Sequence, residues 1–384
     1  MKRQWYLSYL MMLFTVALFS VTAHSQTSVT VSQQMSYYSN SFYNYKQLPD
    51  LNDNVGLSLS HVIEGEKVQS QLYYQGDLNV FKKYLDRFYH TQSLGYDGIA
   101  ASSNHRTTYF FGGNWYWHDG RDDYDVFDYF KIQAYVNAKF YMYHNLIGRV
   151  GYVINNRSYS NLPEFNYWEH LVYFQMNTFF QTGTSITMSV NYGLKDYIPL
   201  QSMQGRGRNL VVDYSRMPAV DQLVSNVKLA QSLGMKTSIS FNYVNRFKPG
   251  LVSGSATVMD SEDLFTEDEL FDDRYGYSGH EVSLSFTHFL PAYIKWEIGS
   301  YYYWKNYHSR QIYDLEGNLD VSGDLRKDQR ALFWSGLSRS FAINWGVKNI
   351  GLSLEGGYLV NESNASYYQF DNYFIMAGMQ FKIK

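Results

Sequence analysis

The sequence predicts an all-β protein whose long antiparallel strands run up and down and close into a transmembrane barrel. Three observations predict this fold class. Hydrophobic and polar residues alternate with a period of two beyond residue 25. The alternating segments are longer than the strands of ordinary sheets, and the links between them are short and long in turn. Together these features predict about sixteen strands, with roughly 14 to 18 allowed by errors at strand ends.

The alternation is clear in residues 130–140. The even positions of this segment are hydrophobic, whereas the odd positions are Lys131, Gln133, Tyr135, Asn137 and Lys139. Residues 67–80, 184–195, 281–287 and 350–355 repeat the pattern. Successive side chains of a strand point to opposite faces, so each segment has one polar and one apolar face.

Strand length separates two architectures that share this pattern, a soluble β-sandwich or solenoid and a transmembrane barrel. Sandwich strands usually run about 5 to 6 residues, whereas bilayer-spanning strands need about 9 to 11. The segments here are of the longer kind, which favours the barrel. Sixteen segments begin near residues 28, 54, 67, 88, 107, 126, 146, 167, 184, 219, 235, 281, 293, 327, 348 and 367.

The links between segments also indicate a barrel. Short links occupy residues 64–66, 101–105, 143–145, 181–183, 233–234, 291–292 and 343–346. Mostly longer links lie between them, at residues 40–53, 118–125, 158–165, 196–217, 247–279, 309–326 and 361–366. Short turns on one side and long loops on the other are typical of outer-membrane barrels.

The N-terminus has the layout of a cleaved signal peptide. Lys2 and Arg3 precede an apolar run at residues 10–21, and the small residues Ala23 and Ser25 follow. The apolar run is shorter than the roughly 20 residues of a spanning helix. We therefore expect a signal peptide at residues 1–25 and a single barrel domain at residues 26–384, exported to the outer membrane.

Composition excludes several functions. The chain has no Cys, which removes disulfides, thiolate metal sites and cysteine nucleophiles. A net charge of −3 without basic blocks argues against nucleic-acid binding. No ordered spacing of carboxylates or histidines predicts a metal, and no motif predicts a cofactor. The sequence thus predicts neither a metal site nor a cofactor.

Aromatic residues gather near the outer ends of predicted strands. Trp115 and Trp117 precede the link at residues 118–125, and Trp304 and Tyr307 end another strand. Amphipathic rings at headgroup level form the interfacial girdles of membrane barrels. These four residues are therefore predicted to lie in a girdle, in contact with outer-membrane lipid.

The last strand supports a resemblance to a known class. In residues 373–383, Tyr373, Ile375, Ala377, Met379, Phe381 and Ile383 occupy alternate positions. With this segment the mature chain resembles a porin-like outer-membrane β-barrel protein of Gram-negative bacteria, with the Tyr- and Asn-rich character of the Bacteroidota. The resemblance implies recognition by the barrel-assembly machinery. The chain departs from the commoner form because it ends in Lys384 and not in an aromatic residue.

The polar faces of the strands are predicted to line the lumen. A barrel of about sixteen strands is wide enough for an aqueous channel, and Tyr rings would suit small hydrophilic solutes, including sugars. The alternative is that these charged side chains pair with one another and fill the lumen. The predicted lining residues are Tyr73, Lys131, Tyr135, Lys139, Arg149, Glu169, Lys195, Lys295, Glu297, Tyr301, Tyr303, Lys305 and Glu355.

Two loops carry opposite charges. Residues 260–273 hold eight acidic residues, and residues 196–217 hold three arginines. If one loop folds inward, the facing charges would form a constriction that selects solutes by charge; the alternative is that both loops are solvated. The candidates for such a constriction are Arg206, Arg208, Arg216, Asp268, Glu269 and Asp272.

The predicted function is a passive or weakly selective channel. The alternative is a non-transport barrel that anchors a surface structure, acts as an adhesin or serves a secretion or polysaccharide-export assembly. An enzyme is not predicted, because the possible pairs Thr287 with His288 and His308 with Ser309 are adjacent on a strand and point to opposite faces.

Overall fold

The computed structural model describes residues 26–102, 106–204, 211–215, 217–252, 273–316, 318–320, 322–343 and 348–383. The predicted signal peptide at residues 1–25 lies outside these ranges. Within them, no helix is both long enough and apolar enough to cross a membrane. The helical elements in these ranges are short 3₁₀ helices of three to six residues, of which η5 at Arg274–Gly276 matters most below.

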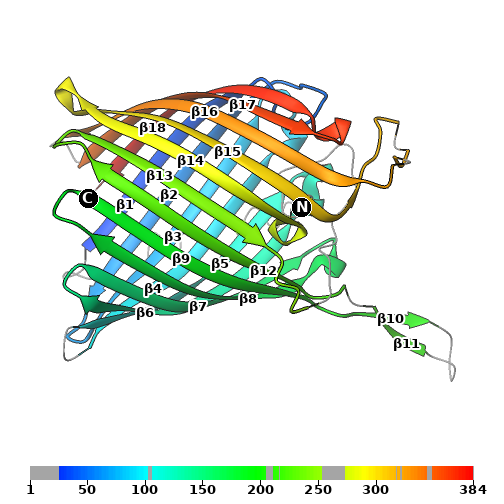
Figure 1. Cartoon of the computed structure of the whole chain (residues 1–384), viewed down its shortest axis with the longest axis horizontal. Coiled ribbons are helices and arrows are strands. Elements are labelled where there is room, and N and C mark those ends of the chain that lie inside the picture. The colour runs from blue at the N-terminus through cyan, green and yellow to red at the C-terminus, as the bar shows by residue number, and fades with distance from the viewer. Residues whose placement is uncertain are drawn as a thin grey trace.

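Sixteen antiparallel strands form a closed barrel, which confirms the predicted fold class and strand number (Figure 1). The sixteen predicted segments coincide with these strands to within a few residues. The strands are β1(Gln26–Tyr38), β2(Asp50–Glu64), β3(Val68–Phe81), β4(Tyr89–Ala101), β5(Thr107–Gly120), β6(Tyr129–Tyr143), β7(Leu146–Tyr159), β8(Tyr167–Phe179), β9(Thr184–Tyr197), β12(Val220–Ser232), β13(Thr237–Phe247), β14(Tyr277–Leu290), β15(Ile294–Gln311), β16(Leu325–Ala342), β17(Asn349–Ser363) and β18(Phe370–Ile383).

The first and last strands close the barrel. β1 pairs with β18 in a register that runs from Val29 opposite Ile383 to Tyr38 opposite Phe374. Every other barrel strand pairs with its neighbours in chain order, apart from the step from β9 to β12, where a hairpin intervenes. Closure leaves no strand edge exposed. The backbone N–H and C=O groups of an open edge would have no hydrogen-bond partners in lipid.

The links alternate in length as predicted, and the long ones share one end of the barrel. This long-loop end carries a separate hairpin of β10(Leu200–Gln204) and β11(Val211–Ser215), which projects from the barrel on the right of Figure 1. The sequence pattern predicts only a loop at residues 196–217. Strands of five residues are too short to span a bilayer, so this pair stays outside the barrel. The link at residues 82–88, which no predicted link covers, contains the single turn η1(Leu85–Arg87).

A small aromatic core lies at the long-loop end. It includes side chains from the short 3₁₀ helices η2(Asp122–Phe127) and η3(Pro163–Phe165), from the inner face of the strands and from η5. The buried members are Phe127, Tyr159, Phe165, Tyr167, Tyr197, Val220 and Tyr275. The loops at this end therefore fold onto the barrel and bury apolar surface there.

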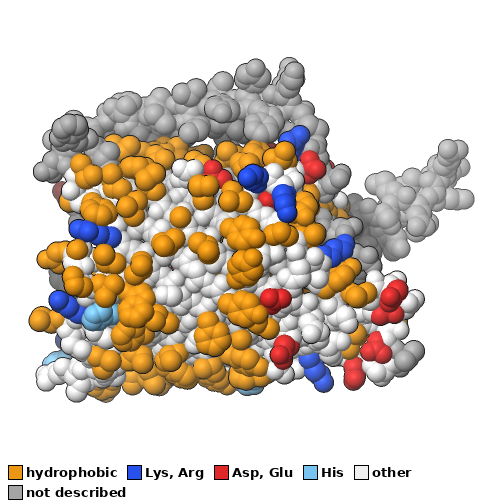
Figure 2. All heavy atoms as spheres, turned by 90° about the horizontal axis from the view of Figure 1, so that it is seen from above, with side chains coloured by type: hydrophobic (Ala, Val, Ile, Leu, Met, Phe, Trp, Pro, Cys, Tyr) orange, Lys and Arg blue, Asp and Glu red, His pale blue; other side chains and the backbone are white. Residues whose placement is uncertain are grey.

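The outer face of the wall is apolar. Val136 is 51% exposed and Met188 is 44% exposed, although both lie in the middle of strands. Figure 2 shows hydrophobic side chains spread over the wall on the face it draws, with most acidic side chains toward the long-loop end. A closed sheet with such a surface is suited to lipid contact.

The predicted aromatic girdle is partly wrong. Trp115 and Trp304 are exposed on the outer face as expected. Tyr307, however, is buried, and its hydroxyl lies 3.4 Å from a carboxylate oxygen of Asp328. Because Tyr307 is three residues beyond Trp304 on the same strand, its side chain points to the opposite face, inside the barrel.

An arginine on the outer face should destabilise the barrel. We expect Val136→Arg or Met188→Arg to cost about 2–4 kcal/mol, because each would place a charge near the bilayer midplane. Urea unfolding of the barrel in lipid vesicles measures this cost. Gln133→Arg is the matched control, since Gln133 lies on the inner face of the same strand as Val136. Equal stability of the three variants would contradict the assignment of faces.

Candidate functional site: the inner wall and the loop segment against it

The predicted lining residues lie on seven strands of the barrel. Their positions alternate with those of the exposed apolar side chains; on β6, for example, Lys131 and Tyr135 alternate with Ile132 and Val136. By this alternation they share the inner face. They are Tyr73 on β3, Lys131, Tyr135 and Lys139 on β6, Arg149 on β7, Glu169 on β8, Lys195 on β9, Lys295, Glu297, Tyr301, Tyr303 and Lys305 on β15, and Glu355 on β17.

Charged side chains near the short-turn end remain accessible. Lys295 forms an ion pair of 2.8 Å with Glu297, and the two side chains are 40% and 34% exposed. Lys139 and Arg149 face each other across β6 and β7. Charges inside a closed barrel are tolerated when water or opposite charges accompany them. The exposure of Lys295 and Glu297 therefore indicates space for water at this end of the barrel.

Near the long-loop end the inner wall is covered. Glu169 and Lys195 retain only 5% and 4% exposure, because the segment Asp273–Gly276 folds against them; we call these four residues the mouth segment. The ammonium of Lys195 lies 2.6 Å from an Asp273 carboxylate oxygen. The Tyr275 hydroxyl donates to Glu169 over 2.5 Å, and Arg274 forms an ion pair with the same carboxylate.

The wall is shaped to receive the mouth segment. At Gly193 on β9, an added Cβ would lie 2.3 Å from the Tyr275 hydroxyl oxygen, so only glycine allows this close approach. Within the segment, the Asp273 carboxylate accepts a hydrogen bond of 3.0 Å from the Tyr275 backbone amide. The Gln222 side chain donates to the Tyr277 carbonyl over 3.0 Å. The end of the long loop is thus attached to β8, β9 and β12.

Cations on aromatic rings form a belt at the same end of the barrel. Each cationic group lies near the face of a Phe or Tyr ring, an arrangement worth about 2 kcal/mol when it is shielded from water. The pairs and their distances to the ring centroid are Arg87 with Phe81 at 4.2 Å, Arg157 with Tyr129 at 4.2 Å, Lys195 with Tyr167 at 4.0 Å, Lys305 with Tyr277 at 4.5 Å, and Arg326 with Tyr307 at 4.5 Å.

Burial shifts the pKa values of loop residues at this end. Burial lowers the pKa of the Arg87 guanidinium to about 10, so it stays charged at neutral pH. Burial together with the Glu169 carboxylate raises the pKa of Tyr275, which therefore remains a hydrogen-bond donor. Burial, with the nearby Asp119 and Asp125 charges, raises the pKa of Asp128 to about 7 against the effect of the Gly120 amide.

The predicted loop constriction can be traced only in part. Its candidates Arg206, Arg208, Arg216, Asp268, Glu269 and Asp272 lie outside the described residues. Asp273, the last member of the acidic run, is described and pairs with Lys195 on the barrel wall. Arg274 and Tyr275 were not predicted as site residues from the sequence. The only signal for such a contact is Gly193 in an otherwise regular strand, since glycine within a strand often marks a close approach.

The residues considered for catalysis make other contacts. His288 lies 2.8 Å from the Thr237 hydroxyl, and the hydroxyl of Thr287 is directed to Glu297. His308 lies 2.9 Å from the Ser278 hydroxyl. In the ranges that the structure covers, no carboxylate is bonded to His308, and no three His, Cys, Asp or Glu side chains gather in an arrangement for a metal ion.

A closed sixteen-strand barrel with an apolar outer face and a charged inner face defines the class of this protein. The chain is a porin-like transmembrane β-barrel. No protein-family model and no curated protein matches its sequence.

Several solved barrels resemble its fold. OpdL of Pseudomonas aeruginosa is 12% identical with a TM-score of 0.49, covering 94% of this chain and 99% of its own. OccAB1 of Acinetobacter baumannii is 9% identical with a TM-score of 0.48; the match covers 94% of this chain and 97% of OccAB1. OmpT of Vibrio cholerae, expressed in the outer membrane, is 12% identical with a TM-score of 0.46; the match covers 93% of this chain and 97% of OmpT. The assignment to a class rests on the barrel of this chain and not on these likenesses.

Removal of the Lys195 ammonium should release the mouth segment. Breaking one partner of a buried ion pair typically costs about 3–5 kcal/mol, and Asp273 is only 1% exposed. In Lys195→Met we expect faster hydrogen exchange at the Tyr275 and Gly276 amides, measured by mass spectrometry. Lys236→Met is the control, because Lys236 is exposed in a short turn. Unchanged exchange in Lys195→Met would show that this pair does not hold the segment.

The raised pKa of Asp128 predicts pH-dependent stability of the loop at residues 121–128. Its pKa in the folded barrel, about 7, exceeds the value of about 3.9 in an unfolded chain. The contribution to stability is therefore complete below about pH 4 and is lost as the pH rises through about 7. Hydrogen-exchange protection of this loop, corrected for the intrinsic rate, should fall between pH 5 and pH 8.

The Asp128→Asn variant isolates this effect. Asparagine cannot ionise, so protection of the loop should then be nearly independent of pH. Asp86→Asn, which removes an exposed loop carboxylate, serves as the control and should keep the wild-type profile. A persistent pH dependence in Asp128→Asn would assign it to another group.

Proposed function

We propose that this protein is a passive, weakly selective outer-membrane channel for small hydrophilic solutes, narrowed at the long-loop end by the mouth segment. The observation that carries the proposal is the inner wall near the short turns, where Lys295 and Glu297 are 40% and 34% exposed within a closed barrel. A lumen filled by protein would bury such side chains. Sixteen strands also enclose enough space for an aqueous channel.

The proposed location is the outer membrane of a Gram-negative, Bacteroidota-like bacterium. Residues 1–25 would direct export and be cleaved, leaving residues 26–384 as the barrel domain. Assembly would depend on the barrel-assembly machinery acting on the final strand. That strand pairs with β1, so its insertion completes the barrel.

The lining residues favour anions in this proposal. Six of the thirteen are cationic and three are carboxylates. Glu169 and Lys195 are paired with the mouth segment, and Glu297 and Lys295 pair with each other. The other five charged residues of the set are four cations (Lys131, Lys139, Arg149 and Lys305) and one carboxylate, Glu355. Lys139 and Arg149 add positive potential where they face each other near the short-turn end. Rings of one charge in a pore select against ions of the same charge.

The mouth segment would set the width of the pore on the outer side. It is bonded to Glu169 and Lys195, so two predicted lining residues support a constriction and do not contact solute. The sequence suggested an inward-folded loop whose acidic residues face loop arginines. In the mouth segment an acidic residue, Asp273, instead faces a strand lysine, Lys195. Solutes would pass between this segment and the opposite wall.

Planar-bilayer recording of the refolded mature protein tests the proposal. A salt gradient should give steady conductance and a reversal potential that reports anion preference. Lys131→Gln should shift the reversal potential by a few millivolts toward cation preference, and Glu355→Gln should shift it the other way, because each removes a charge from the lining. Lys327→Gln, on the exposed outer face of β16, is the control.

Two outcomes would contradict the channel. A folded barrel without conductance would indicate a filled lumen and favour a role as a surface anchor, adhesin or assembly component. A conducting barrel whose selectivity is the same in both lining variants would show that Lys131 and Glu355 lie away from the conducting path.

A further inference from the structure

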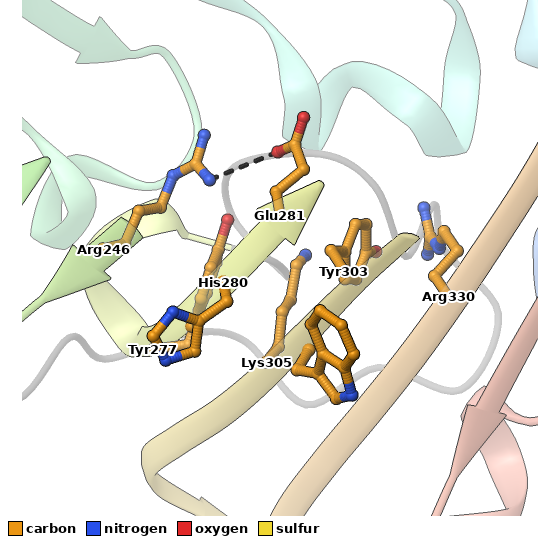
Figure 3. A pocket seen from close by; sticks show the side chains of 9 residues that line it. Arg246, Tyr277, His280, Glu281, Tyr303, Lys305 and Arg330 are labelled. Carbon is orange, nitrogen blue, oxygen red and sulfur yellow. Dashed lines mark hydrogen bonds and ion pairs between the residues drawn. The ribbon is translucent and has the colours of Figure 1, made fainter. Parts of the chain in front are cut away.

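A small cavity on the inner wall at the long-loop end is bordered by groups that the barrel itself uses. Its volume is about 200 Å³, and Arg246 and Glu281, which form an ion pair of 3.3 Å, lie beside it (Figure 3). Lys305 and Arg330 also line it, but they are only 8% and 9% exposed. These cations therefore belong to the packing of the wall, and the outer face of the same end offers a different kind of site.

A larger cavity, of about 600 Å³, lies on the outer face at the long-loop end. One side of it is formed by Tyr358 on β17 and Asp371 on β18. Asp371 precedes Tyr373 by two residues, and Tyr373 is exposed on the outer face, so Asp371 shares that face. Tyr45 and Gln47, from the link between β1 and β2, line the other side. The volume falls within the roughly 300–1,000 Å³ typical of ligand sites.

Hydrogen bonds hold this outer cavity in shape. The Gln47 side chain donates to one oxygen of the Asp371 carboxylate over 2.8 Å, and the Tyr358 hydroxyl donates to the other over 3.4 Å. The Tyr45 backbone amide donates to the Tyr367 carbonyl over 3.1 Å, which fixes the link to the segment before β18. A carboxylate accepts about four hydrogen bonds. Asp371 therefore keeps acceptor sites for the donors of a ligand.

Two tyrosine rings are exposed at the outer cavity. Tyr45 is 36% exposed and Tyr358 is 46% exposed. The Tyr45 ring meets the Tyr367 ring edge to face, with 5.4 Å between centroids, and this contact orients it. A tyrosine ring offers a flat apolar face beside a polar hydroxyl. The apolar C–H face of a sugar ring is complementary to such a surface.

The charges around the outer cavity are balanced. Glu362 and Asp371 line it, and its lining residues include no Lys or Arg. Two lysines flank it. Lys46 belongs to the link beside the cavity, and Lys327 lies on β16 two residues from Gln329, the partner of Glu362. Two carboxylates and two ammonium groups give no net charge, so the surroundings favour a neutral ligand.

The outer cavity lies beside the lipid-facing wall. Tyr373 and Ile375 follow Asp371 on the same face of β18 and are 50% and 56% exposed. Exposed aromatic residues of membrane barrels mark the level of the lipid headgroups, and the long-loop end of such barrels faces the outside. An occupant of the cavity would therefore lie among the headgroups of the outer leaflet, and acyl chains attached to it would run along the apolar wall.

We propose that the outer cavity binds the neutral sugar headgroup of a glycolipid in the outer leaflet. The sugar ring would pack on the Tyr358 ring, and its hydroxyls would donate to Asp371 and bond with the Gln369 amide. Headgroups without a sugar lack these hydroxyl donors. Phosphorylated sugars would bring an anion toward Glu362 and Asp371, which is unfavourable.

Native mass spectrometry of the refolded barrel, in a detergent without a sugar, tests this assignment. Digalactosyldiacylglycerol and monoglucosyldiacylglycerol are the probes, and phosphatidylcholine with the same acyl chains is the comparison. We expect the wild type to retain at least one glycolipid at concentrations at least about tenfold below those needed for phosphatidylcholine. Asp371→Asn should weaken this retention about tenfold, because it removes a charged acceptor. Tyr358→Ala should weaken it as well.

Asp53→Asn is the matched control. Asp53 lies on the outer face of β2, two residues before the exposed Val55, and its carboxylate also accepts from a glutamine side chain, that of Gln33, over 3.2 Å. The variant loses the same kind of hydrogen bond away from the cavity, so its retention should equal that of the wild type. Equal retention of phosphatidylcholine, wild-type retention in Asp371→Asn, or an equal loss in Asp53→Asn would each overturn the assignment.

Free melibiose separates a lipid headgroup from a soluble sugar. It carries two sugar rings but no acyl chains, so it should displace the glycolipid only at concentrations at least about tenfold higher, because it gains no contact with the apolar wall. Melibiose that binds as tightly as the glycolipid would overturn the assignment to a membrane lipid. These measurements need no current through the barrel, so their outcome is independent of the proposed channel.

Discussion

Pairing of every backbone polar group within the sheet is the constraint on which the rest of this structure depends. Lipid offers no hydrogen-bond partners, so a strand edge inside a membrane is strongly unfavourable. The pairing of β1 with β18, ten residues in register from Val29 to Tyr38, removes the last edge. Closure then forces each strand to present one face to lipid and the other to the interior. The apolar wall and the charged interior both follow from it.

The interior divides into two zones with different physical character. Toward the short turns, Lys295 and Glu297 remain exposed enough to be hydrated. Toward the long loops, the mouth segment and the aromatic core bury the wall, and Lys195 is stabilised by Asp273 and by the Tyr167 ring. Buried charges of this kind are stable only when each is paired. A hydrated passage with a supported constriction is the arrangement that the proposed channel requires.

The cation–aromatic belt is a second feature of the long-loop end. It holds positive charge at fixed positions on the inner wall, where rings replace part of the water lost from each cation. At Lys195 this arrangement supports the mouth segment. At Lys305 it places an ammonium against the Tyr277 and Tyr303 rings, where the lysine is only 8% exposed.

From the sequence alone, the all-β barrel could be predicted, with about sixteen strands in a range of roughly 14 to 18, and with the face on which most strand residues lie. A period of two is a local property that the barrel cannot alter, because a shift of one residue would turn every apolar side chain away from lipid. Where this rule was overlooked, at Tyr307, the prediction was wrong. The contacts of Asp273 with Lys195 and of Tyr275 with Glu169 became evident only from the folded barrel. The path of a loop depends on which strands the closed barrel brings together and on where the wall leaves room, as at Gly193 beside the Tyr275 hydroxyl. Neither is encoded in a local sequence pattern.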